Sequence, residues 1–284
     1  MAYKNIDIQM ILPKQVVHWK IAHCPKRHVK DNEYRISIEL KDKKRQYSCI
    51  SFEDLLKLIQ RTPVERRVFY EHISRGDAVK FYLDFEYYLI PENTMVKREK
   101  ALFSIQKLFV NTMRLVSNIV DISDDQLIFL ESSSSEKCSY HVICDNERIR
   151  FIDSDSLHVF IEEVLRFILL SSLNHQCIRN RNCVVNNNND DCSLSELMEL
   201  FEHIRLECFG CTECTIRNVQ LTISDVCNLF VYNRNHQLVS CIDLSVYCVE
   251  QDFRMFMCTK IGEVRPLRKS TWEGPNEPNK SMEG

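Results

Sequence analysis

Alternating apolar and polar residues predict β-strands along much of the chain. Residues 34–40 alternate in this way, residues 41–46 read as a charged turn, and a second strand is expected near 47–51. Residues 79–89 are the strongest candidate, because aromatic and branched side chains dominate them. Further strands are expected at 126–131, 139–144, 228–232, 238–248 and 252–258.

Helical spacing of apolar residues predicts a second class of element. Helices are expected at 52–60, 97–119, 153–170 and 194–206. Asp155 or Ser156 is expected to cap the helix at 153–170. Strands mixed with helices, and hairpins towards the C-terminus, indicate an α+β fold.

The pattern also divides the chain. A small N-terminal α/β module is expected at 1–76, and a larger module at 77–264. Residues 174–217 are mostly polar and rich in asparagine, which predicts a disordered insertion within the larger module. Residues 265–284 contain proline, glycine and many polar side chains and are expected to form a disordered tail.

Composition narrows the class of protein. No apolar run approaches the roughly 18 residues that a membrane span needs, so no membrane partner is expected. The 14 cysteines are scattered and no secretory signal precedes them, which favours reduced thiols. A net charge of −3 disfavours a protein that merely coats nucleic acid. With only 5 glycines, the chain lacks the glycine-rich phosphate loops GxGxxG and GxxxxGK[ST].

Three carboxylates are the first candidates for chemistry. Asp84 and Glu86 lie two apart in an expected strand, so both side chains emerge on the same face. Asp243 begins another apolar segment, CIDLSVY. Carboxylates that converge from two strands could hold two Mg²⁺ or Mn²⁺ ions for phosphoryl transfer. A solvated strand face is the alternative reading, and it is the commoner one for an isolated DxE.

A second group could bind phosphate. If residues 137–143 are extended, Lys137, Ser139 and His141 share one face. An ammonium, a hydroxyl and an imidazole in a row can hold phosphate oxygens by charge and hydrogen bonds. An ordinary buried or surface histidine remains the alternative for His141.

Taken together, these segments resemble the archaeo-eukaryotic primase superfamily, and most closely its eukaryotic primase/polymerase (PrimPol) family. FYLDFEYY is similar to the first catalytic motif of the family, FLESSSSEKCSYHVI to the second and IDLSVYCVEQDFRMFMCTKIG to the third. RVFYEHI, just before the first motif, also fits. The similarity spans about residues 30–264, apart from 174–217.

The resemblance implies a core with a sheet like that of the RNA-recognition motif, which carries all three acids. It implies a DNA-directed primase/polymerase that transfers nucleotides from (d)NTPs in replication restart and damage tolerance. Asp84, Glu86 and Asp243 would bind two Mn²⁺ or Mg²⁺ ions. The residues implied to contact nucleotide, phosphate or template are Lys137, Ser139, His141, Arg254, Lys260 and, on a poorer alignment, Arg45.

Partners and location also follow from the resemblance. It implies a monomer that binds DNA template and primer in the nucleus or mitochondrion, with single-stranded-DNA-binding proteins as further candidate partners. The family continues beyond the third motif into a zinc-binding domain, so we expect this sequence to be C-terminally truncated. Gln251 stands where the family usually has arginine, which removes one positive charge.

Other readings remain open. A nucleic-acid-binding protein that keeps the fold with weakened catalysis is the main alternative function. A metal nuclease is less favoured, since Lys137 and His141 would then lack a purpose. His203, Cys208, Cys211 and Cys214 could in principle hold zinc, but the tight CxxCxxC spacing favours free cysteines in a loop.

Overall fold

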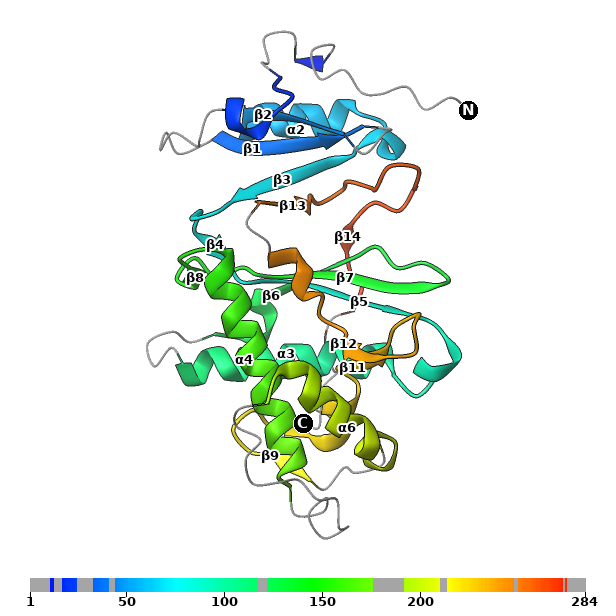
Figure 1. Cartoon of the computed structure of the whole chain (residues 1–284). Helices are drawn as coiled ribbons and strands as arrows, with labels where there is room; N and C mark the ends of the chain where they lie inside the picture. The colour runs from blue at the N-terminus through cyan, green and yellow to red at the C-terminus, as the bar shows by residue number, and fades with distance from the viewer. Residues whose placement is uncertain are drawn as a thin grey trace, which may run out of the picture.

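The computed structural model describes residues 11–12, 17–24, 33–40, 44–116, 122–175, 192–209, 214–247, 250–272 and 274. Its architecture is mixed α+β with antiparallel sheets, as the sequence predicts. Two four-stranded sheets lie one above the other in Figure 1, and most helices gather below the second sheet. Within the described residues, no helix is both long and apolar enough to cross a membrane.

The first sheet joins distant parts of the chain. Its strands are β1 (Glu33–Glu39), β2 (Arg45–Ser51), β3 (Phe69–Ser74) and β13 (Glu250–Arg254), in the order β13-β3-β1-β2. All neighbours are antiparallel. Helix α2 (Phe52–Arg61) packs against this sheet, and the Ser51 hydroxyl caps it by accepting the Asp54 N–H. The expected N-terminal module therefore shares its sheet with a strand that starts at residue 250.

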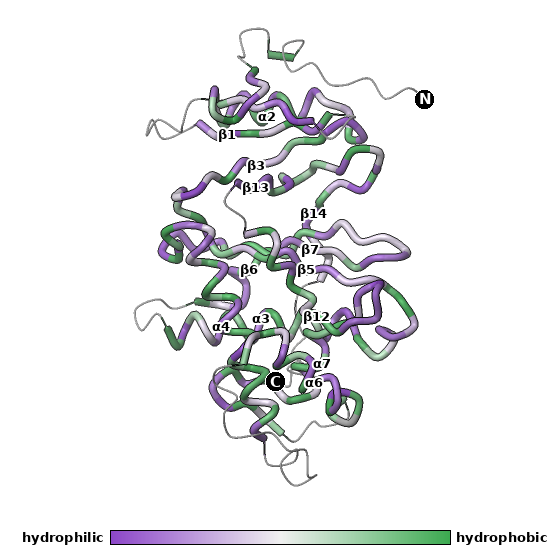
Figure 2. Tube along the Cα trace, in the orientation of Figure 1, coloured by the Kyte–Doolittle hydropathy of each residue, from purple (hydrophilic) through white to green (hydrophobic). Residues whose placement is uncertain are grey.

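The second sheet lies at the centre of the molecule. Its strands are β5 (Tyr82–Tyr88), β6 (Leu127–Glu131), β7 (Lys137–Cys144) and β14 (Arg268–Lys269), in the order β14-β6-β7-β5. Helices α3 (Arg98–Val116) and α4 (Ser154–Leu173) bury their apolar residues with this sheet in one large cluster. Figure 2 shows hydrophobic and hydrophilic residues alternating along α4, as expected of a helix with one buried side.

Shorter elements complete the fold. Helices α6 (Leu194–Cys208) and α7 (Ile223–Cys227) pack beside α4. The remaining strands pair as β4 (Val79–Lys80) with β8 (Arg150–Phe151), β9 (Thr215–Ile216) with β10 (Leu221–Thr222), and β11 (Phe230–Tyr232) with β12 (Leu238–Ser240). Single 3₁₀ turns occur at η1 (Ile21–His23), η2 (Val64–Arg66), η3 (Pro91–Asn93), η4 (Asp124–Gln126) and η6 (Leu244–Tyr247).

Several boundaries differ from the sequence-based expectations. The side chain that caps α4 is Asp153, whose Oδ1 accepts the Ser156 N–H, rather than Asp155 or Ser156. The strand expected at 238–248 ends at Ser240, and a 3₁₀ turn follows Asp243. Asp243 lies on no named strand, but Ile242 before it forms an isolated antiparallel bridge with Phe85, so the Asp243 segment borders β5 at the edge of the second sheet.

Two segments expected to be disordered contain ordered parts. Leu197 and Phe201 of α6 are fully buried, so this part of 174–217 belongs to the core, while 176–191 lie outside the described residues. In the expected tail, β14 pairs with β6 and Leu267 is fully buried. Trp272 packs on Phe129, with 4.7 Å between ring centroids. The tail prediction is thus wrong for 265–272.

Candidate active site

Two neighbouring strands place most of the predicted site residues on one face. In the antiparallel register of β5 and β7, Asp84 lies opposite His141 and Glu86 lies opposite Ser139. Lys137 begins β7 two residues before Ser139, so it shares that face. The alternate residues of both strands point into the helical core. Five polar side chains thus emerge together on the side that faces β13.

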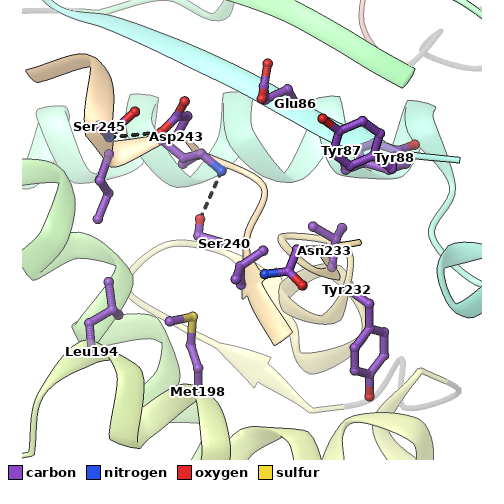
Figure 3. A pocket seen from close by; sticks show the side chains of 14 residues that line it. Glu86, Tyr87, Tyr88, Leu194, Met198, Tyr232, Asn233, Ser240, Asp243 and Ser245 are labelled. Atoms are coloured by element: carbon purple, nitrogen blue, oxygen red, sulfur yellow. Dashed lines mark hydrogen bonds between the residues drawn. The ribbon is translucent and has the colours of Figure 1, made fainter. Parts of the chain in front are cut away.

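Asp243 reaches the same place without belonging to a strand. Its backbone N–H donates to the Asp84 carbonyl at 2.9 Å, and the Glu86 N–H donates to the Cys241 carbonyl at 2.8 Å. The segment around Asp243 therefore runs antiparallel beside β5. One Asp243 carboxylate oxygen accepts the Ser245 N–H at 2.9 Å. The three acids predicted as metal ligands are neighbours along the backbone, linked by these hydrogen bonds. Figure 3 shows two of them, Glu86 and Asp243.

The carboxyl group of Asp84 is electrostatically strained. Burial raises its pKa to about 7, and the nearby charges of Glu86 and Asp243 act in the same direction. Lys260 and Lys137 offset only part of this effect. Its Oδ1 atom is buried and has no hydrogen-bond partner within the described residues. A buried oxygen of this kind is stabilised by a proton or by a bound cation.

Glu86 already has a cationic partner. The Lys137 ammonium donates to a Glu86 carboxylate oxygen, and the same ammonium lies 5.3 Å from the Tyr88 ring centroid. Two residues with different predicted roles, metal ligand and phosphate contact, are thus paired with each other. Among the described residues, no three carboxylate, imidazole or thiol groups converge closely enough to form a ready-made metal cluster.

His141 is a buried, uncharged imidazole. Burial lowers its pKa well below the usual value, and the positive charges of Arg254 and Lys260 lower it further. The ring stacks on Phe253 with 4.1 Å between centroids, which fixes its orientation. Its Nδ1 is buried without a hydrogen-bond partner in the described chain. His141 can therefore contribute a hydrogen bond, but not a charge, to a ligand at neutral pH.

Arg254 brings a buried guanidinium to the site from the first sheet. It ends β13 and donates from Nη2 to the Ser132 hydroxyl at 2.6 Å. Arg265 donates from Nη1 to the Ser132 carbonyl at 2.7 Å, so two arginines meet at one serine. The Arg254 Nε is buried and has no partner among the described residues. These donors form a local positive region beside the carboxylates.

Three cavities meet around these residues. The Asp84 cavity, about 410 Å³, is lined by predicted residues Asp84, His141, Arg254, Lys260 and Arg45. The basic cavity, about 260 Å³, shares Arg254 and Lys260 with it and adds Lys137 and Ser139. The α6 cavity, about 420 Å³, is bordered by Glu86 and Asp243 on one side and by Leu194 and Met198 of α6 on the other (Figure 3).

Arg45 lines the Asp84 cavity but is already engaged. Its guanidinium forms an ion pair with Asp252 at 3.1 Å and donates to the Ser37 hydroxyl at 3.0 Å. It also covers the Tyr70 ring at 4.4 Å. The uncharged Gln251 lines the same cavity. The positive charge of the cavity therefore depends mainly on Arg254 and Lys260.

No model of a protein family matches the chain, and no curated protein matches it.

Sequence reasoning missed several polar residues of the basic cavity, among them Ser132, Arg234 and Arg265. Ser132 lies in the serine run of the second motif, but only its contact with Arg254 distinguishes it from its neighbours. Arg234 sits in the turn between β11 and β12, with its guanidinium 4.0 Å from the Tyr88 ring centroid. Arg265 falls in the segment expected to be a disordered tail. None of them follows a periodic pattern that could have revealed it.

The candidate zinc ligands do not form a metal site among the residues that the structure describes. His203 is exposed on α6, whereas Cys208 is buried on the same helix. Cys214 is half-buried and Cys211 lies outside the described residues. The expectation of free cysteines here stays a prediction.

Proposed function

We propose that this chain is a metal-dependent nucleotidyltransferase, a DNA primase/polymerase with the core of the archaeo-eukaryotic primase superfamily. The observation that carries the proposal is that three acids on neighbouring backbone segments lie beside a cavity rich in cations. Backbone hydrogen bonds hold the Asp243 segment beside Asp84 and Glu86, and Arg254 and Lys260 line the adjoining cavities. Acids that bind metal, placed beside cations that bind phosphate, suit transfer from a triphosphate.

The acids fit a divalent cation such as Mn²⁺ or Mg²⁺. The unpartnered Asp84 Oδ1 and the raised pKa of that carboxyl group are features that a bound cation would relieve. Glu86 would have to exchange the Lys137 ammonium for the metal, and Lys137 also borders the basic cavity that would then receive it. When bound, two such ions supply activation of the acceptor hydroxyl and neutralisation of the triphosphate.

The chain's own residues have separate tasks in this proposal. Arg254, Lys260 and Arg265 hold the triphosphate in the basic cavity by charge and hydrogen bonds. His141, stacked on Phe253, donates a hydrogen bond from a fixed ring. The α6 cavity, with carboxylates at one side and apolar residues at the other, is placed to receive the last nucleoside of the growing strand.

The alternative is a nucleic-acid-binding protein with this fold and weak catalysis. The pairing of Glu86 with Lys137 and the uncharged Gln251 favour it. The proposed activity implies a DNA template and primer as partners, and the nucleus or mitochondrion as location.

Incorporation of labelled deoxynucleotide into a primed template with Mn²⁺ tests the proposal. Asp84→Asn/Glu86→Gln preserves shape and removes two charges, and it should lower the rate by about a hundredfold or more, since metal stabilisation contributes several kcal/mol. Asp145→Asn/Glu147→Gln has the same spacing in an exposed loop and should keep wild-type activity. Template binding without incorporation by the wild type would favour the alternative.

A further inference from the structure

A separate cavity lies between the two sheets and shares no lining residue with the basic cavity. This rear cavity has a volume of about 260 Å³ and borders β1, β3, β4, β5, β7, β8 and β13. The residues that carry the inference are Arg35, Lys80, Arg150, Phe253, Glu71 and Asp77. None of the tasks proposed above uses its cationic side chains.

Arg35 is a buried cation with unused hydrogen-bonding capacity. Only 7% of the residue is exposed, and it lines the rear cavity. Nη1 donates to the Ser74 hydroxyl, while Nε is buried and makes no hydrogen bond within the described chain. Burying a guanidinium N–H without an acceptor is costly, so an acceptor in the cavity would stabilise it.

Two further cations oppose each other at the rim. Lys80 of β4 lies directly opposite Arg150 of β8 in the antiparallel pair. Like charges at opposed positions destabilise a sheet unless an anion lies between them. Lys80 also contacts Asp145 at 3.1 Å, but both side chains are substantially exposed, so that pair can be exchanged at little cost.

Two acids, Asp77 and Glu71, line the rear cavity together with these cations. Asp77 is committed to its own turn, where Oδ2 accepts the Ser74 N–H at 3.0 Å. Glu71 is exposed to solvent. Three cations therefore face two carboxylates, and the only buried charged side chain among them is Arg35.

Phe253 connects the rear cavity with the Asp84 cavity. It lines both, and its ring contacts His141 at 4.1 Å and Tyr82 at 4.7 Å between centroids. We propose that the rear cavity binds a phosphate group of a single nucleic-acid strand, seated on Arg35 with Lys80 and Arg150 at the rim. Such a strand would continue past Phe253 towards the carboxylates, and this direction alone rests on the proposed function.

Binding of a labelled single-stranded oligonucleotide, measured by fluorescence anisotropy with EDTA present, tests the site without catalysis. Lys80→Glu/Arg150→Glu changes only the rim, and it should weaken binding by about tenfold and make its salt dependence shallower. Lys100→Glu/Arg148→Glu makes the same charge change at exposed positions outside the cavity and should alter affinity less than about twofold. Arg35→Met should weaken binding as well, with a melting curve to verify that it folds.

Equal losses of oligonucleotide affinity in Lys80→Glu/Arg150→Glu and Lys100→Glu/Arg148→Glu would overturn the proposal. Such a result would mean that the strand is attracted by the overall charge of the protein and not by this cavity. Competition separates the sources of phosphate. Unlabelled oligonucleotide should displace the probe, and ATP or pyrophosphate at the same phosphate concentration should not. If ATP alone lost affinity in Lys80→Glu/Arg150→Glu, the assignment to a strand would be overturned. If the protein binds the oligonucleotide as described but incorporates no nucleotide, the proposed function is wrong and the rear-cavity site still stands.

Discussion

Asp84 is the residue whose protonation responds most directly to the arrangement of the site. Its pKa of about 7 in the folded chain lies above the usual value for an aspartate. Between roughly pH 4 and 7 the folded state therefore binds more protons here than the unfolded state. The free energy of unfolding falls as pH rises through that window, because the folded chain increasingly holds a buried, ionised carboxylate.

We predict that Asp84→Asn removes this pH dependence. At pH 4 the variant and the wild type should unfold at similar denaturant concentrations. At pH 8 the variant should be more stable by roughly 4 kcal/mol, because each pKa unit of the shift corresponds to about 1.4 kcal/mol. Mn²⁺ should restore the wild type at pH 8 and leave the variant unchanged. Asp145→Asn, on an exposed loop, should show no such trend. A constant difference between wild type and Asp84→Asn at all pH values would contradict the electrostatic explanation.

His141 should matter through hydrogen bonding rather than charge. We predict that His141→Ala lowers kcat/KM for the nucleotide. The loss should correspond to roughly 1–3 kcal/mol of transition-state stabilisation, the range for a hydrogen bond to a charged group. Because burial keeps the pKa of His141 well below its usual value, the wild-type pH profile should show no step from this ring. Nucleotide titrations at fixed primer–template measure both effects. His158, which stacks on Tyr247 as His141 stacks on Phe253, provides the control, and His158→Ala should be neutral.

At the scale of elements, the sequence predicted what local patterns determine. Strands β5 and β7 and helices α3, α4 and α6 lie close to their expected positions. In each, the spacing of apolar residues along the sequence matches the side that the structure buries. The shared face of Asp84 and Glu86 follows from strand geometry alone. Their register against His141 and Ser139 does not follow from local geometry. It depends on how β5 pairs with β7, a strand far away in the sequence; Lys137 and Glu86, for example, are 51 residues apart.

The elements that the sequence missed are those formed by tertiary contacts. Strand β3 is short, and its pairing with both β1 and β13 fixes it. Asp243 is positioned by backbone hydrogen bonds to β5 rather than by a strand of its own. β14 has two residues in a polar segment with no alternation, and only its contact with β6 reveals it. Arg265 was missed for the same reason.

We predict that the start of the expected tail stabilises the whole protein. Leu267→Ala should lower the free energy of unfolding by about 2–5 kcal/mol, because Leu267 is fully buried beside β6. Val264→Ala, at a position that is 70% exposed, should change it by less than about 0.5 kcal/mol. Urea unfolding measures both variants. Similar midpoints for the two would mean that residues 265–272 are not part of the folded core.

At the scale of the molecule, one strand links the two sheets. β13 pairs with β3 of the first sheet, yet its Phe253 and Arg254 contact His141 and Ser132 beside the second sheet. The ring nitrogens of His72 in β3 form hydrogen bonds with β13, to the carboxylates of Asp252 at 3.0 Å and Glu250 at 2.8 Å. The position of Arg254 over the carboxylates thus depends on the first sheet being folded.

The same arrangement predicts how the N-terminal part behaves alone. The small core of the first sheet includes Cys258, which is fully buried and comes from the segment after β13. A fragment of residues 1–76 lacks both Cys258 and the strand that covers the edge of β3, so it should show no cooperative thermal transition. Ser74 lies opposite Glu250 in the antiparallel register, so an Asn-Gly turn that joins them would close a hairpin. Residues 11–74 fused in this way to 250–262 should regain cooperative melting, measured by circular dichroism. If residues 1–76 melt cooperatively without this addition, the first sheet is an independent module and β13 is only docked on its edge.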